Sequence, residues 1–79
     1  MTPAMARTIL LRAGTVPVEC PSLIGFEPET RALDASNDRN AVMLAKVIED
    51  NRERGIDTAI VKDSTGRLSA WVRSNPFWN

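Results

Sequence analysis

The chain contains no histidine and no tyrosine. Without histidine it lacks the commonest general base, the histidine-activated serine and cysteine nucleophiles, and the ligands of most zinc sites. Carboxylates remain, as the pair Glu49/Glu53, four residues apart, and the pair Glu27/Glu29, on either side of Pro28. Neither pair lies in an apolar segment that would push two carboxyl pKa values apart, so a solvated acidic surface is the favoured interpretation. We therefore expect a protein that is not an enzyme, with no catalytic residue, no metal site and no cofactor.

Cysteine and long apolar runs are also scarce. Cys20 is the only cysteine, so it has no partner for an internal disulfide, and no neighbour in sequence is expected to lower the pKa of its thiol. No apolar run approaches the roughly 20 residues that span a bilayer, and the first seven residues lack the regions of a secretory signal. These absences predict a cytoplasmic protein with no membrane contact.

Charge shows no overall excess, because ten basic and ten acidic residues cancel. The first 18 residues carry Arg7 and Arg12 and no acid, residues 19–63 carry all ten acids, and the remainder carries Arg67 and Arg73 and no acid. The chain as a whole is therefore not a strong attractor of nucleic acid. Its 79 residues are enough for one domain, in which a helix layer covers a sheet, with little room for a deep pocket.

The clearest predicted element is a helix over residues 37–54. Ser36 is the expected N-cap, and Gly55 is the expected terminating glycine. An apolar stripe at helical spacing defines the buried face and consists of Ala41, Leu44, Ala45 and Ile48.

The other predicted elements are strands. Residues 58–62 and 68–73 form a β-hairpin around a turn at residues 63–66. In the first half we expect a strand at 8–11, an edge strand at 15–19 because it contains Pro17, a loop with apolar anchors at 21–28, and a short strand at 31–34. The predicted order is β-(β)-β-α-β-β, an α+β fold of two layers: a small antiparallel sheet with one helix on one face. The prediction is one domain over residues 1–79, ending in an aromatic tail at 74–79.

Two surfaces are candidates for binding a partner. If Leu68, Ala70 and Val72 face the helix, the last strand presents Arg67, Ser69, Trp71 and Arg73 on the opposite side, with the composition of a binding hot spot. The alternative is that Trp71 points inward and fills the core. The second surface is the outer helix face with Glu49, Asp50 and Glu53, either an acidic patch that meets a basic partner or an ordinary solvated face.

The helix–hairpin unit from Ser36 to Arg73, about half of the chain, resembles the small anti-CRISPR inhibitors of bacteriophages and other mobile elements in size and layout. Those inhibitors share no common motif, so no residue role is carried over. The resemblance implies a non-catalytic inhibitor in the host cytoplasm. Its partner would be a protein, a multi-subunit nucleic-acid-guided effector, which it would block from target DNA by steric and electrostatic occlusion.

Two alternatives stay open. One is a small nucleic-acid-binding or adaptor module that uses the arginines and Trp71 on the sheet face, in the manner of sheet-based single-strand binders. The other is a small enzyme that acts through carboxylates.

Overall fold

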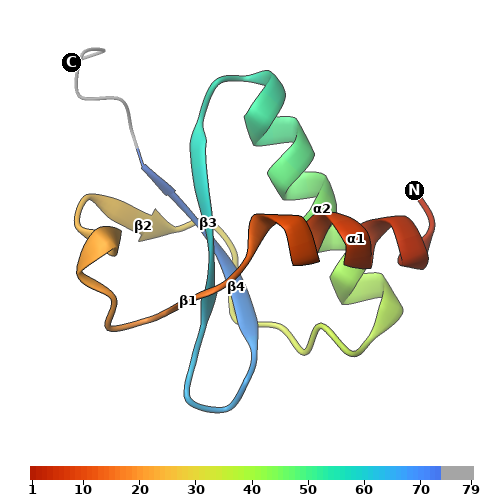
Figure 1. Cartoon of the computed structure of the whole chain (residues 1–79), viewed down its shortest axis with the longest axis horizontal. Coiled ribbons are helices and arrows are strands. Elements are labelled where there is room, and N and C mark those ends of the chain that lie inside the picture. Colours follow the sequence, from red (N-terminus) through yellow and green to blue (C-terminus); the bar gives the residue numbers. More distant parts are fainter. Residues whose placement is uncertain (74–79) are drawn as a thin grey trace.

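The computed structural model describes residues 1–73 and contains two helices, a short 3-10 helix and four strands. In chain order these are α1 (Pro3–Ala13), β1 (Val16–Pro17), η1 (Pro21–Leu23), β2 (Phe26–Pro28), α2 (Asp38–Glu53), β3 (Asp57–Lys62) and β4 (Leu68–Arg73). Figure 1 shows both helices on one side of the sheet. The predicted α+β fold of helix packed on sheet is confirmed. The predicted aromatic tail, 74–79, lies outside the described residues.

Helix α2 occupies the predicted position, but its N-cap is Asn37 and not Ser36. The Asn37 side chain accepts a hydrogen bond from the Asn40 N–H at 3.2 Å, satisfying one free donor of the first turn. Ser36 lies one residue before the cap, where its N–H and its hydroxyl both donate to Asp34 Oδ1, the hydroxyl at 2.7 Å. At the other end Gly55 has a φ of +70°, and the N–H of Ile56 donates to the Asn51 carbonyl at 2.8 Å. These bonds form the glycine-terminated helix end that the sequence predicts.

The β-hairpin is also confirmed. β3 and β4 pair antiparallel from Asp57↔Arg73 to Lys62↔Leu68. In the connecting turn, Asp63 Oδ1 accepts bonds from the Thr65 N–H, the Thr65 hydroxyl and the Arg67 N–H. A side chain that satisfies three turn donors fixes where β3 ends and β4 begins.

The strand predicted at residues 8–11 is wrong, because this segment belongs to helix α1. Thr2 caps the helix by accepting the Met5 N–H at 3.2 Å, Pro3 lies in its first turn, and Gly14 follows its last residue. Arg7 ties α1 to the start of α2 through an ion pair with Asp38 at 2.9 Å. The sheet therefore carries two helices on this face and not the single helix expected.

The sheet is mixed and not wholly antiparallel, with the strand order β1-β3-β4-β2. The predicted edge strand at 15–19 exists as the shorter β1, but it runs parallel to β3. The predicted loop at 21–28 contains β2, which pairs antiparallel with β4. The strand predicted at 31–34 is reduced to one bridge between Leu33 and Leu68. The expectation of a wholly antiparallel sheet is therefore wrong, because β1 pairs in parallel with a strand far from it in sequence.

The main core lies between the sheet and the helices. Leu33, Leu44, Ile60 and Ala70 form its buried centre, and Leu10 of α1 packs against it. A second cluster of Ala6, Ala41 and Ala45 joins the two helices, where small side chains permit close approach. No helix of residues 1–73 is long and apolar enough to cross a membrane.

The connection from β1 to β2 runs from one edge of the sheet to the other. Figure 1 shows this segment on the left of the sheet, away from the helices on the right. Leu23 in η1 is buried, and so are Val61 and Ser69, which point away from the helices. Among residues 1–73, the connection thus covers part of the second face of the sheet, on which Ala59 and Trp71 are only partly buried.

Candidate interaction surfaces

Trp71 faces away from the helices. Its neighbour Ala70 is fully buried in the main core, so alternation along β4 directs Trp71 to the opposite face. The indole Nε1–H donates to the hydroxyl of Ser69, two residues earlier on the same face, at 3.0 Å. Trp71 is only partly buried. Of the two orientations left open by the sequence, the structure has the one in which Leu68 and Ala70 face the core.

The strands on either side place further residues next to Trp71. Pro28 of β2 and Ala59 of β3 are its register partners, and Phe26 of β2 is the partner of Arg73. Because register partners share a face, these five residues lie together on the sheet. We call them the Trp71 surface: Phe26, Pro28, Ala59, Trp71 and Arg73. Pro28 and Arg73 are exposed and the other three are half-buried.

Arg73 is held in place within this surface. Its Nη2 lies 2.6 Å from Asp57 Oδ2, directly across the β3–β4 pair. Its guanidinium carbon lies 5.1 Å from the centroid of the Phe26 ring, within cation–π range. A Cβ at Gly25 would lie 3.5 Å from the Arg73 Cδ, an ordinary contact distance, so the φ of +87° and not lack of space favours glycine beside the arginine. The guanidinium is therefore oriented before any partner arrives.

Arg67, the other arginine of the predicted strip, lies elsewhere. It belongs to the β3–β4 turn, four residues before Trp71, and its charge lowers the pKa of the carboxyls of Asp34 and Asp63. Those pKa values are lowered first by hydrogen bonds, from Ser36 to Asp34 and from Thr65 to Asp63. The structure thus brings Trp71 and Arg73 together and separates Arg67 from them.

The three acidic residues predicted on α2 do not form one patch. Glu49 lies on the side that faces α1, in a hollow of about 120 Å³ that Arg12 and Arg52 also line, and its carboxylate is 4.0 Å from the Arg52 guanidinium. Asp50 and Glu53 are exposed. Helical spacing puts them on the outward face together with the basic side chains Arg39, Lys46 and Arg54. The outward face of α2 therefore carries both acidic and basic side chains.

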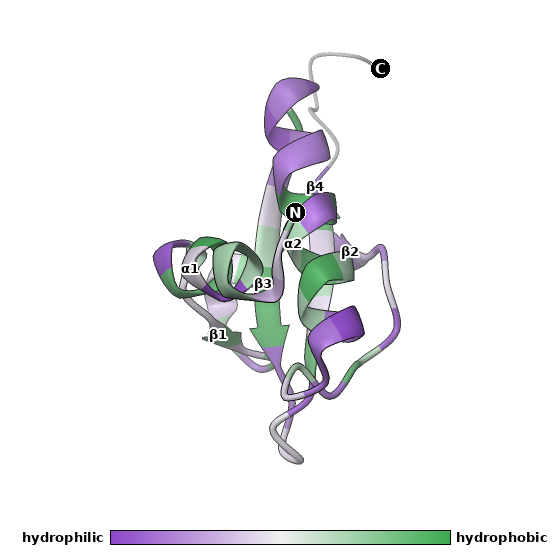
Figure 2. Cartoon of the chain, turned by 90° about the vertical axis from the view of Figure 1, so that its right-hand side faces the viewer, coloured by the Kyte–Doolittle hydropathy of each residue, from purple (hydrophilic) through white to green (hydrophobic). Residues whose placement is uncertain are grey.

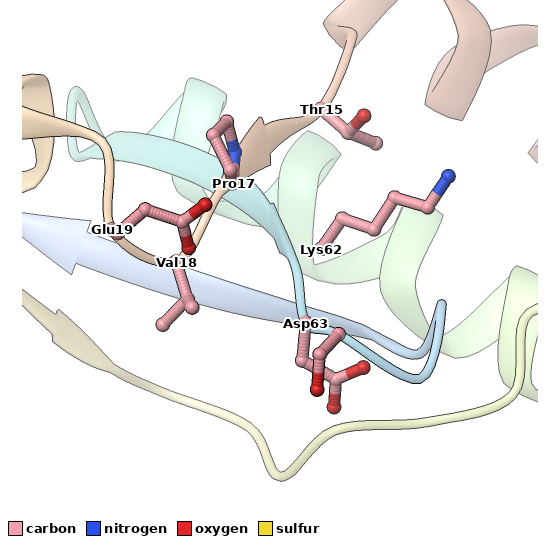
Figure 3. A pocket seen from close by; sticks show the side chains of 7 residues that line it. Thr15, Pro17, Val18, Glu19, Lys62 and Asp63 are labelled. Atoms are coloured by element: carbon pink, nitrogen blue, oxygen red, sulfur yellow. The ribbon is translucent and has the colours of Figure 1, made fainter.

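A separate hollow of about 350 Å³ lies beside β1 and contains none of the predicted residues. Figure 3 shows the Lys62 ammonium on the side of Thr15, with Glu19 and Val18 toward the opposite end. The lining residues are Thr15, Pro17, Val18, Glu19, Lys62, Asp63 and Ser64. Charges of both signs alternate along it, so it has no preference for one ionic ligand. Within residues 1–73, no three acidic or cysteine side chains gather closely enough to hold a metal ion.

Both edges of the sheet carry a proline in the position that faces outward. The N–H of Val18 donates to the Lys62 carbonyl, so the backbone of Pro17 points away from β3. Its carbonyl accepts the Cys20 N–H at 3.0 Å. The N–H of Glu29 donates to the Ala70 carbonyl, which by the same alternation turns Pro28 outward from β4. Proline has no N–H to offer an added strand, so recognition by strand addition is disfavoured at both edges.

The thiol of Cys20 differs from its prediction. It lies 3.0 Å from the hydroxyl of Ser22, and hydrogen bonding with Ser22 lowers the pKa of the thiol. This contact is with a hydroxyl and not with a base or a helix N-terminus, and so it was not predicted. The thiol has no nearby base and carries no proposed role.

Sequence reasoning missed Ala59 of the Trp71 surface and, more consequentially, Phe26 and Pro28. They sit in a stretch rich in proline and glycine, which favoured a loop. A signal was present, because Phe-Glu-Pro places two apolar residues on one face of a strand with a solvated residue between them. Comparisons with protein-family models, with curated proteins and with solved structures found no match for this chain.

Proposed function

We propose that this protein is a non-catalytic protein-binding inhibitor of the anti-CRISPR kind, and that it contacts its partner through the Trp71 surface. The observation that carries the proposal is the grouping of Phe26, Pro28, Trp71 and Arg73 on neighbouring strands of an incompletely covered sheet face. Tryptophan and arginine are the residue types most often responsible for binding energy at protein interfaces. The partner would be an effector that is kept from its target DNA by occlusion.

Rigidity supports this assignment. Arg73 is bonded to Asp57, and the Trp71 indole is bonded to Ser69. Side chains that are already ordered lose less conformational entropy when a partner binds. The outward prolines at the sheet edges further favour contact through side chains on a face over strand addition.

Charge favours a protein partner over the alternative, a nucleic acid. Affinity for nucleic acid comes largely from unpaired basic residues that displace counterions. On the Trp71 surface the single arginine is paired with Asp57, and the charge of Arg67 acts on the carboxylates of Asp34 and Asp63. The acidic residues of α2, Glu49, Asp50 and Glu53, remain a second proposed contact.

The proposal is tested in bacteria with an active CRISPR system that are challenged with a targeted plasmid. We expect the wild-type chain to protect the plasmid, and Trp71→Ala or Pro28→Glu to reduce protection at least tenfold, on the order of 1.4 kcal/mol or more of binding. Met43→Ala, at an exposed position of α2, is the control. Full protection by both surface variants would refute the site, and no protection by the wild-type chain against any effector class tried would refute the inhibitor.

The nucleic-acid alternative makes an opposite prediction. If the protein binds nucleic acid, fluorescence anisotropy with a labelled single-stranded oligonucleotide would show binding that falls steeply with salt and is lost in Trp71→Ala. We expect no such binding. A salt-dependent complex would favour the alternative over the inhibitor.

A further inference from the structure

A groove runs between the C-terminal ends of α1 and α2 and reaches the start of β3. It consists of two hollows: the one of about 120 Å³ beside Glu49, and a wider one of about 410 Å³. The two hollows adjoin, because Ala13, Ile48 and Arg52 line both of them. Figure 2, in which α1 is seen nearly end-on, shows α1 beside α2 with β3 behind them. The groove thus lies on the helix side of the sheet, whereas Trp71 faces away from the helices.

Much of the lining of this groove is apolar. Ile9 of α1, Ile48 of α2 and Ile56 before β3 line it and are each half-buried, so part of every one of these side chains remains in contact with water. Ala13 and Gly55 lie between them and have no long side chain that could close the groove. An apolar ligand lying along the groove would therefore remove the rest of this surface from water.

The narrow end of the groove carries positive charge without a close partner. Among residues 1–73, Arg12 has no ion pair, and the Arg52 guanidinium lies 4.0 Å from the Glu49 carboxylate, beyond the ~2.9 Å of a charge-assisted hydrogen bond. The acid at the wide end, Asp57, is already bonded to Arg73 at 2.6 Å. Two guanidinium groups thus stand against one loosely held carboxylate. This end suits one anionic group of a ligand.

We propose that the groove binds a small amphipathic carboxylate, of the kind represented by a medium-chain fatty acid. Its carboxylate lies between Arg12 and Arg52, whose planar guanidinium groups match a carboxylate in shape and charge. Its chain runs past Ile48 toward Ile56. A purely ionic ligand would leave the isoleucine side chains uncovered, and an uncharged apolar ligand would leave the arginines unpaired.

The size of the groove sets the length of the chain. Glu49 and Gly55 are six positions apart, which at the rise of an α-helix is ~9 Å, about the length of an eight-carbon chain. The wider hollow alone falls within the range of roughly 300–1,000 Å³ that is typical of small-molecule sites. Octanoate has about ten non-hydrogen atoms, and the groove covers it on one side only, so we expect a dissociation constant on the order of 1 to 10 mM.

The test is a titration of the ¹⁵N-labelled full chain with sodium octanoate to about 30 mM, followed by ¹H–¹⁵N correlation spectra. Saturable shifts should concentrate at the amides of residues 9–13 and 48–58. Two probes separate the parts of the ligand. Acetate has the charge without the chain, and octylammonium has the chain with the opposite charge. Each should shift these amides at least fivefold less than octanoate does at equal concentration, because each lacks one of the two interactions.

Two variants test the residues. Arg12→Gln removes one guanidinium and should weaken octanoate binding at least threefold, and Ala13→Glu places a carboxylate in the groove and should weaken it at least tenfold. Their matched controls are Arg39→Gln, on the outward face of α2, and Ala4→Glu, in the first turn of α1. All four positions are exposed, so the fold should be retained, and the controls should bind as the wild type does.

Absence of saturable shifts up to about 30 mM octanoate would overturn the proposal. So would equal shifts with acetate or octylammonium, or equal binding by the Arg12 variant and its Arg39 control. Shifts confined to the Trp71 surface would also overturn it, because the chain would then only be covering exposed aromatic side chains. The result is separable from the proposed function, since Trp71→Ala leaves every residue of the groove in place and should bind octanoate as the wild type does.

Discussion

Replacing Asn51 by aspartate would turn a buried hydrogen-bond donor into a second carboxylate. Asn51 of α2 is 1% exposed, and its Nδ2 donates to Glu29 Oε2 at 2.8 Å. In Asn51→Asp, a carboxylate oxygen of nearly the same size would replace the amide nitrogen, at the same distance from Glu29 Oε2. The hydrogen bond would be lost and two negative charges would be opposed.

The cost can be worked from these contacts. A rise of about two units in the pKa of the new carboxyl corresponds to ~2.7 kcal/mol of stability at neutral pH, and the lost hydrogen bond adds about 1 kcal/mol. Glu29 is exposed, so solvent screens part of the repulsion. We expect a total loss of about 2–3 kcal/mol from the free energy of unfolding.

The sign of the pH dependence follows from the raised pKa of the folded state. Below the unfolded pKa of about 4 the new carboxyl is protonated in both states and can donate to Glu29, so the electrostatic cost is absent. The electrostatic cost to the free energy of unfolding grows as the pH rises and reaches its full value above the folded pKa of the new carboxyl. Acidification should therefore bring the stability of Asn51→Asp closer to that of the wild type.

Urea unfolding near pH 7 and near pH 4, followed by circular dichroism, measures both quantities. Asn51→Ala is the control, because it removes the bond without adding charge and should lose similar stability at the two pH values. Adding Glu29→Gln to Asn51→Asp restores the hydrogen bond in the reverse direction, because the amide introduced at position 29 can donate to the carboxylate introduced at position 51. The double variant should recover most of the lost stability. A loss that is the same at both pH values, or no recovery in the double variant, would refute the reasoning.

Three further changes test other parts of the fold. Leu44→Ala empties a fully buried position at the centre of the main core and should cost about 3–4 kcal/mol in urea unfolding, a large share of the total for a domain of this size. Gly55→Ala should cost about 1 kcal/mol in thermal unfolding, because the φ of +70° and not lack of space demands glycine there. Asp63→Asn should be less stable than the wild type at neutral pH. Since the folded pKa of Asp63 is lowered, its contribution is present above the unfolded pKa and lost as pH falls through the folded pKa, so the two proteins should converge in acid.

The parts of the fold predicted correctly are those encoded by neighbouring residues. α2 has an apolar stripe and a terminating Gly55, and the hairpin has a turn organised by Asp63. All these signals act within about five residues. The N-cap was misplaced by one position because Ser36 and Asn37 are both good caps, and in the structure it is Asn37 that accepts the Asn40 N–H.

Helix α1 was predictable and was missed. Thr2, Pro3 and Gly14 are start and stop signals, and Ala6, Ile9 and Leu10 recur at helical spacing. The run of Ile9, Leu10 and Leu11 nevertheless favoured a strand, because apolar residues of α1 point outward as well as inward. The exposed Met5 and Leu11 blur the amphipathic pattern of α1, and this hid the helix from sequence reasoning.

Local sequence patterns could not predict the order of the strands in the sheet. Val16 and Val61 pair although 45 positions separate them, and β2 lies beside β4 and not beside β1. Such contacts depend on the path of the whole chain. For the same reason Trp71 was identified as a candidate while Phe26 and Pro28 were not. Their common face exists only after the β1–β2 connection has crossed the sheet.

This crossing also explains why one face of the sheet is available for binding. The helices fill the first face with Leu44, Leu10 and their neighbours, and the β1–β2 connection covers the second face only as far as Val61 and Ser69. The chain then reaches the far edge and returns as β2, which places Pro28 beside Trp71 and Phe26 beside Arg73. At the two sheet edges, Pro17 and Pro28 have no outward N–H group to donate to an added strand. A partner is thus directed to side chains on the sheet face, where Trp71 and Arg73 are already oriented by their bonds to Ser69 and Asp57.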